Sequence, residues 1–258
     1  MEDITFAQEE FGSAELGDAR RTERAVLIAL RLCERLHGLV SKAISKDAER
    51  EGTYRFLENK KVSIEALGRA RAVACARRME AVGGFIIVPV DQTSLRLHDH
   101  TGKAGFGSVG TRKGKAQGIH VDTALAMTEQ GVPLGILDQQ YFVRAKERSP
   151  IRKAGSRETR HDPRPRAQRE SQHVLDTLDR ALSVAREYAP SAVPWFQVDR
   201  GGDFWPAFDW AGQNQAVMTV RRSEPERGGR AWADVAAAKL AEAPFNLLVR
   251  TRGRGANT

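Results

Sequence analysis

The chain has 258 residues, of which 41% are hydrophobic and 29% are charged. This length and composition exclude a disordered tail and indicate a folded protein with one main core and a smaller attached domain. Lys and Arg number 41 against 33 Asp and Glu, so the formal net charge is +8 and the isoelectric point is near 9.8. Such an excess of positive charge favours a polyanionic partner, with nucleic acid ahead of an anionic membrane.

The sequence contains no sign of a membrane segment. No apolar run approaches the roughly 18 residues needed to cross a bilayer, and the N-terminus lacks the basic-then-apolar order of a signal peptide. We therefore expect a cytoplasmic protein with no membrane partner. Cys33 and Cys75 lie in Ala- and Leu-rich helical patterns without a Cys-x-x-Cys partner, so we expect reduced thiols and no zinc site.

The first 83 residues predict a helical domain. One helix begins after the capping residue Asp18, and its apolar positions recur at helical spacing as far as Gly38. Further helices are expected from about Asp47 and from Ser63, the latter continuing to the glycines at 83 and 84. Cations in the first turns of a helix oppose its macrodipole, so an anionic partner is expected near the arginines there. These are Arg20, Arg21 and Arg24.

From residue 84 to 258 the pattern changes to a mixed α/β core. Three strands, a crossover helix and a fourth strand are the order of a ribonuclease-H-like core, in which the fourth strand pairs beside the first. The expected fold class is therefore α/β with a mixed sheet behind an N-terminal helical domain. Strands are predicted at 85–91, 118–127, 132–144, 193–199 and 215–221, with helices at 168–188 and 203–211. Basic loops are expected at 103–118 and 148–169.

Two of the predicted strands end on an aspartate, Asp91 and Asp199. If these strands are neighbours in one sheet, both carboxylates emerge at the same edge. Carboxylate oxygens suit Mg²⁺, and two aspartates brought together from distant sequence are what a metal-dependent phosphodiester-cleaving site needs. The alternative is structural, because aspartate commonly follows a strand as a turn residue or a helix N-cap.

Four ordered motifs resemble those of the bacterial cut-and-paste transposases of the insertion-sequence-four group, in particular the transposon-five type. They are Phe11 to Arg24, Glu51 to Asn59, Asp91 to Leu95 and Asp199 to Asp203. The resemblance covers nearly the whole chain. It implies an N-terminal helical domain that recognises transposon ends, and a catalytic core whose Asp-Asp-Glu triad binds two Mg²⁺ or Mn²⁺ ions.

The resemblance also implies roles for individual residues. Asp91 and Asp199 match the first and second triad carboxylates, which hold metals that activate a water and then the freed 3′-hydroxyl. The basic residues that match the end-binding helices are Arg20, Arg21, Arg24 and Arg55, with Lys60 and Lys61 nearby. A Gly- and Lys-rich loop supplies further phosphate-contact candidates in Lys103, Arg112, Lys113 and Lys115. For each of these cations the alternative is a solvated surface position.

The sequence departs from the family at the third acid. In the family this glutamate lies on a helix after a β-rich insertion, whereas the sequence ends at Thr258 inside what matches that insertion. Glu224, Glu226 and Glu242 follow Asp199 too closely to match it. We therefore expect a transposase portion truncated before the triad glutamate and before the family's C-terminal dimerisation region.

Two functions remain open at this stage. The first is a DNA transposase, present as an N-terminal portion that binds double-stranded transposon ends and can dimerise there with a full-length transposase in the bacterial cytoplasm, at the nucleoid. The second is a catalytically inactive DNA-binding regulator that inhibits the full-length enzyme.

Two histidine-containing segments also have open interpretations. The run His98-Asp99-His100 is either a metal clamp or a polar turn, and its place at a strand end favours the turn. His120 begins a predicted strand, where it faces DNA or packs in the core; we favour packing.

Overall fold

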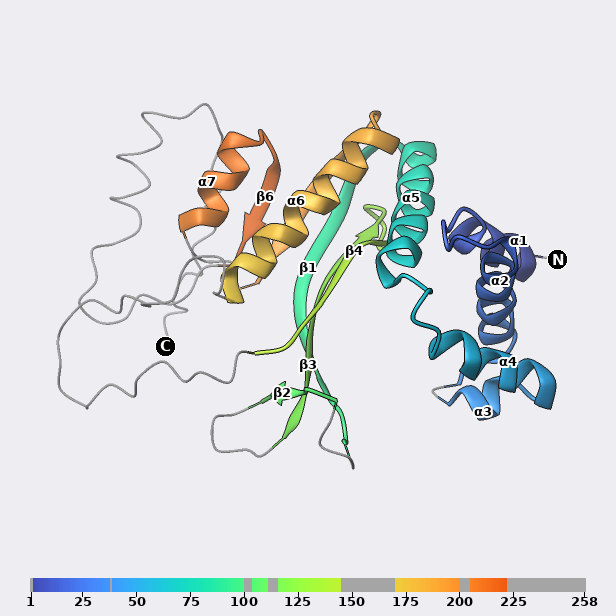
Figure 1. The fold of residues 1–258 in the computed structure, drawn as a ribbon. Helices are drawn as coiled ribbons and strands as arrows, with labels where there is room; N and C mark the ends of the chain where they lie inside the picture. Colours follow the sequence, from blue (N-terminus) through green and yellow to red (C-terminus); the bar gives the residue numbers. More distant parts are fainter. Residues whose placement is uncertain are drawn as a thin grey trace, which may run out of the picture.

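The protein is described by a computed structural model at residues 2–37, 39–99, 104–110, 116–144, 170–199 and 205–221. It is a mixed α/β protein in which N-terminal helices precede a mixed sheet, as the sequence predicted (Figure 1). The helices are α1 (Glu2–Phe11), α2 (Ala19–Glu34), α3 (Val40–Ala43), α4 (Asp47–Leu57), α5 (Ile64–Val82), α6 (Glu170–Tyr188) and α7 (Trp205–Gln213). The strands are β1 (Gly84–Arg96), β2 (Gly107–Ser108), β3 (Gln117–Met127), β4 (Pro133–Phe142), β5 (Ala192–Val198) and β6 (Val217–Val220). None of these helices is long and apolar enough to cross a membrane.

Side-chain caps set the starts of two N-terminal helices. Asp18 Oδ1 accepts the Arg20 backbone N–H at 2.9 Å, and Ser63 Oγ accepts that of Ala66 at 3.0 Å, so both predicted helix starts are confirmed. Helix α2 ends at Glu34, before the expected Gly38. Leu36, beyond the end of the helix, is 91% exposed and contributes nothing to the core.

The sheet brings the first and fourth long strands together. Its order is β2-β3-β1-β5-β6, with β4 also paired to β3. Strand β1 runs antiparallel to β3 and parallel to β5, and β5 runs parallel to β6. The predicted pairing of the fourth strand beside the first is therefore confirmed, and the strand order is the one expected of a ribonuclease-H-like core.

Strand β1 corrects one prediction. The sequence placed its end at Asp91, but the strand continues to Arg96. The polar residues that follow Asp91 extend the antiparallel ladder with β3, from Gln92 opposite Asp122 to Arg96 opposite Gly118. Cross-strand hydrogen bonding to β3 satisfies this backbone, which local sequence does not reveal. Asp91 thus lies within a strand.

Helix α5 contributes to two hydrophobic clusters. Its first half joins a small cluster with α1, α2 and α4, in which Ala70 packs with Phe56 and Ala25. Its second half, including Cys75 and Met79, joins the main core beneath the sheet. Helices α5 and α6 pack against each other and against strands of the sheet, while α1 to α4 stand to one side (Figure 1).

Polar contacts reinforce this position of α5. Arg78 pairs with Glu9 and Glu10 of α1, and its Nε donates to the carbonyl oxygen of Leu134 at 2.6 Å. Gly135 follows with φ +140°, and a Cβ at this position would meet Cys75 Cβ at 3.2 Å. A glycine is therefore needed where β4 passes under the helix.

The extension of β1 makes Gly118 sensitive to substitution. A Cβ at Gly118 would lie 1.8 Å from the carbonyl oxygen of Leu95, which cannot move without breaking the ladder. We expect Gly118→Ala to lower the free energy of unfolding by about 1–3 kcal/mol, measured by urea denaturation. The control is Gly68→Ala in α5, where a Cβ meets nothing within 4 Å. Because alanine favours the helix, this control should raise stability by about 0.5–1 kcal/mol. Equal effects of the two substitutions would contradict the register.

Candidate nucleic-acid interface and acidic site

The structure brings Asp91 and Asp199 onto neighbouring strands. In the parallel pair of β1 and β5, Val90 lies opposite Val198, and the two aspartates are the next residues of each chain segment. Neighbouring strands are about 4.8 Å apart, so Asp91, within β1, and Asp199, just after the end of β5, lie side by side. Both valines are buried in the core, and side chains alternate along a strand, so the aspartates belong to the opposite, open face. Both are exposed.

The donor set of this pair suits a hard divalent cation. Mg²⁺ is commonly bound through one or two carboxylates, with water and substrate phosphates completing its shell. The Asp91 carboxylate has no hydrogen-bond or ion-pair partner within the described ranges, so its oxygens remain available. Within the part of the chain that the structure describes, no group of three or more Asp, Glu, His or Cys side chains is placed to hold a metal ion. The pair therefore fits a metal that also takes ligands from water and phosphate.

A polar row crosses the open face from Asp91. Thr123 of β3 lies opposite Asp91, and Gln139 of β4 lies opposite Thr123. Gln139 Nε2 donates to Thr123 Oγ1 at 3.0 Å, while its Oε1 accepts from Tyr141 Oη at 2.6 Å and from Arg71 Nη1 at 3.2 Å. No local sequence signal marks these residues, because only the strand register places them beside the aspartate.

The remaining acids and loop cations of the sequence analysis lie outside the described residues. These are Lys103, Arg112, Lys113, Lys115, Glu224, Glu226 and Glu242, together with the 148–169 loop. In the other predicted loop, Gly107 and Ser108 form β2 against β3.

The structure tests one of the two histidine segments, the one that contains His120. In the run 98–100, Asp99 Oδ2 accepts the backbone N–H of Ala104 at 2.7 Å, while His100 lies outside the described residues, so the polar turn stays a prediction. His120 is fully buried, with Nδ1 3.1 Å from Ser94 Oγ and its ring stacked on Phe142 at 5.3 Å. The preference for packing over DNA contact is therefore confirmed for His120.

Many cations of the N-terminal helices are engaged within the protein. Arg21 Nη1 donates to the carbonyl oxygen of Leu16 at 2.6 Å, and Arg55 pairs with Glu51 one turn earlier. The Arg24 guanidinium lies over Gly52, where an added Cβ would be 2.9 Å from Nη1. Arg21 and Arg55 therefore have polar partners within the protein, whereas the Arg24 guanidinium is placed by packing over Gly52.

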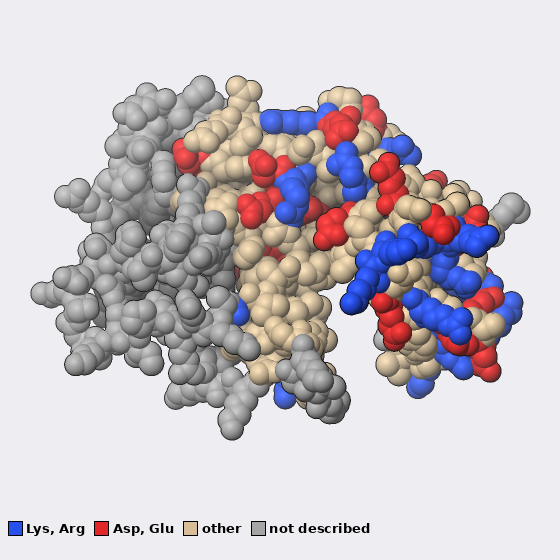
Figure 2. All heavy atoms as spheres, viewed as in Figure 1, with Lys and Arg blue, Asp and Glu red and all other residues tan. Residues whose placement is uncertain are grey.

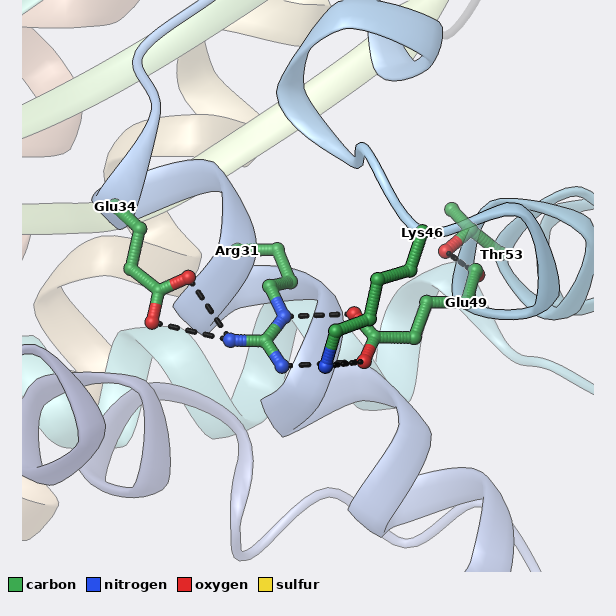
Figure 3. A network of polar contacts seen from close by, with 5 residues as sticks. All are labelled: Arg31, Glu34, Lys46, Glu49 and Thr53. Atoms are coloured by element: carbon green, nitrogen blue, oxygen red, sulfur yellow. Dashed lines mark hydrogen bonds and ion pairs between the residues drawn. The ribbon is translucent and has the colours of Figure 1, made fainter.

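A network of ion pairs joins α2 to α4 (Figure 3). Arg31 Nε donates to Glu49 Oε2 at 2.7 Å, its Nη1 reaches Glu34 at 2.9 Å, and Lys46 Nζ lies 3.3 Å from Glu49. The hydrogen bond from Arg31 lowers the pKa of Glu49 to about 2, against an opposing effect of burial. The same bond, with that to Glu34, raises the pKa of Arg31. Arg31 therefore serves the helix packing.

Arg20 and Lys60 differ from the engaged cations. Both are exposed, and among the described residues neither side chain has a hydrogen-bond or ion-pair partner. Leu16 and Ala25, on either side of Arg20 in the sequence, pack in the same cluster as Phe56 and Val62, on either side of Lys60, so the two cations belong to segments that meet at this cluster. Figure 2 shows Lys and Arg gathered over the N-terminal helices, with Asp and Glu between them.

Comparison with known families addresses these helices directly. Residues 3–62 match the family model described as transposase DNA-binding. The match spans α1 to α4 and includes Arg20, Arg21, Arg24, Arg55 and Lys60. The N-terminal helices are therefore similar to a transposase DNA-binding domain, and their role is transposase-related binding of DNA.

The ion-pair network predicts a pH dependence for the stability of the N-terminal helices. Because the folded-state pKa of Glu49 lies below its ordinary value of 4.5, its stabilisation is present above pH 4.5 and is lost as pH falls toward 2. Glu49→Gln should lower the melting temperature at pH 6, and this difference from the unsubstituted protein should vanish near pH 2.

The matched control for this experiment is Glu51→Gln. The Arg55–Glu51 pair has side chains 76% and 64% exposed, so its removal should change the melting temperature less. A difference between Glu49→Gln and the unsubstituted protein that stays constant with pH would contradict the assignment.

Proposed function

We propose that the chain is a DNA transposase of the insertion-sequence-four, transposon-five type, or a portion of one, which binds transposon-end DNA through its N-terminal helices. The match of residues 3–62 to the transposase DNA-binding family carries this proposal. The four sequence motifs support the narrower assignment, since two of them lie in the helices and two contain the aspartates.

In this proposal Arg20 and Lys60 contact the phosphate backbone. Their side chains are exposed and unengaged within the described residues, so they give up no internal partner on binding. Phosphate contacts of this kind position helices on a duplex, and base edges provide the sequence recognition. Arg21, Arg24 and Arg55 would then orient the helices and contact DNA only where their internal contacts permit.

Asp91 and Asp199 would hold Mg²⁺, or Mn²⁺ as its substitute. When bound, the ion would supply an activated water and neutralise charge on the phosphodiester. The two aspartates would orient it at the open face of the sheet, where their mutual repulsion favours a bound cation. The DNA strand would reach them from the solvent side.

The proposed partner is the double-stranded end of a transposon, on which the chain could dimerise with a full-length transposase. The expected location is the bacterial cytoplasm, at the nucleoid. The alternative is a DNA-binding regulator, which binds transposon ends without cleaving them and inhibits the full-length enzyme.

The DNA-binding part is tested by Arg20→Ala combined with Lys60→Ala. We expect affinity for transposon-end DNA to fall about tenfold or more, since a hydrogen bond to a charged group contributes about 1.5–3 kcal/mol. The slope of log affinity against log salt concentration should become shallower by about 0.9 for each phosphate that is no longer neutralised. Fluorescence anisotropy at several salt concentrations measures both.

The control removes two other exposed cations, Arg35→Ala with Lys42→Ala. They lie beyond the other end of α2, which is about 24 Å long. Unchanged affinity and slope in the Arg20 and Lys60 variant, with weaker binding in the control, would move the interface to that opposite end.

The acidic pair is tested by nicking of supercoiled plasmid at low salt with Mg²⁺ and then Mn²⁺. We expect nicking by the unsubstituted chain and a fall to background in Asp91→Asn and in Asp199→Asn. Glu129→Gln, an exposed acid in a turn of the same sheet, should leave the rate unchanged. Binding of end DNA without any nicking would instead favour the regulator, and inhibition of a full-length transposase would then test it.

A further inference from the structure

The hydrogen bonds of the polar row on the open face run from donor to acceptor in one direction, from Arg71 through Gln139 to Thr123. Arg71 can only donate hydrogen bonds, so the Gln139 atom that faces it must be the carbonyl oxygen Oε1. Tyr141 Oη donates to the same oxygen. The Gln139 amide nitrogen is thereby turned toward Thr123, where it donates to Oγ1 at 3.0 Å. The orientation of Gln139 is therefore fixed by its neighbours.

The direction of these hydrogen bonds determines whether the Thr123 hydroxyl is free to donate a further hydrogen bond or to accept one. Its oxygen already accepts a hydrogen bond from Gln139, and within the described residues no acceptor for its own proton is found. On the other side of Thr123 lies Asp91, its cross-strand partner, whose carboxylate is likewise unpaired among those residues. Directly opposite residues have Cβ atoms about 4.5–5.5 Å apart, so a small acceptor can lie beside both.

We propose that the Thr123 hydroxyl donates a hydrogen bond to a phosphate oxygen of the DNA strand held at Asp91. Gln139 and Arg71 keep the Thr123 hydroxyl oriented as a donor toward that phosphate. The inference rests on the proposed function of the acidic pair. A phosphate oxygen is an acceptor only, and it can reach a cation at Asp91 while accepting from a neighbouring hydroxyl. Thr123 is thus a substrate-binding residue, and Gln139 and Arg71 are positioning residues.

The experiment measures DNA affinity with and without Ca²⁺, a divalent oxygen-binding cation, using the full chain and fluorescence anisotropy. The gain in affinity on adding Ca²⁺ reports binding of phosphate at the acidic pair without relying on cleavage. Thr123→Val keeps the side-chain shape and a good strand former but removes the hydroxyl, whereas Thr123→Ser retains it. We expect Thr123→Val to reduce the gain about tenfold, with Thr123→Ser close to the unsubstituted chain and metal-free affinity unchanged.

Gln139→Glu provides a sharper variant. A glutamate has the same shape and still pairs with Arg71, but its carboxylate can only accept hydrogen bonds. It would therefore accept the hydrogen bond of the Thr123 hydroxyl in place of the phosphate. We expect it to reduce the Ca²⁺-dependent gain as Thr123→Val does. Combining the two substitutions should have no further effect, because the hydroxyl is then already absent. An additional reduction in the double variant would assign the effect of Gln139→Glu to its charge and overturn the role of Gln139.

The outcomes separate this inference from the proposed function. If Asp91→Asn abolishes the gain while Thr123→Val matches the unsubstituted chain, the acidic pair stands and the proposed hydrogen bond from Thr123 is wrong. If Asp91→Asn leaves the gain intact, the acidic site itself fails. Thermal unfolding of each variant confirms that the chain remains folded.

Discussion

The packing of α5 is the constraint on which the other features depend. This 19-residue helix contributes side chains to both hydrophobic clusters. Its small residues, such as Ala72 and Ala76, allow close approach to the sheet. Arg78 fixes the helix to α1 and to β4 at once. Because the helix is buried on several sides, the DNA-binding helices and the acidic face are held in one relative arrangement. Arg71 on the same helix also reaches the polar row beside the aspartates.

The alternation of side chains across the sheet separates packing from chemistry. On one face Val88, Val90 and Val198 pack beneath α5 and α6, and this burial holds the strands in register. The other face presents Asp91, Thr123 and Gln139 in neighbouring strands, where they remain partly or fully exposed. A shift of one residue in any pairing would exchange the two sets. The apolar core therefore determines which polar groups can meet a ligand.

In the N-terminal helices the internal contacts decide which cations are available to DNA. Arg31 has two glutamate partners and lies in the interface of α2 with α4. Arg20 and Lys60 have equal formal charge but no partner in the described part of the chain. An exposed cation binds phosphate without breaking an internal ion pair, whereas an engaged one must exchange partners. The surface charge in Figure 2 is therefore larger than the charge free for DNA.

The sequence by itself determined the order and type of the main elements, the caps at Asp18 and Ser63, the DNA-binding segment and the two aspartates. These follow from hydrophobic period, capping and local motifs, which depend on nearby residues. It did not determine that β1 continues past Asp91, that Thr123 and Gln139 stand beside it, or that Arg31 is engaged and Arg20 is not. Only the tertiary structure decided these points, because strand register and ion-pair partners join residues that are distant in the sequence.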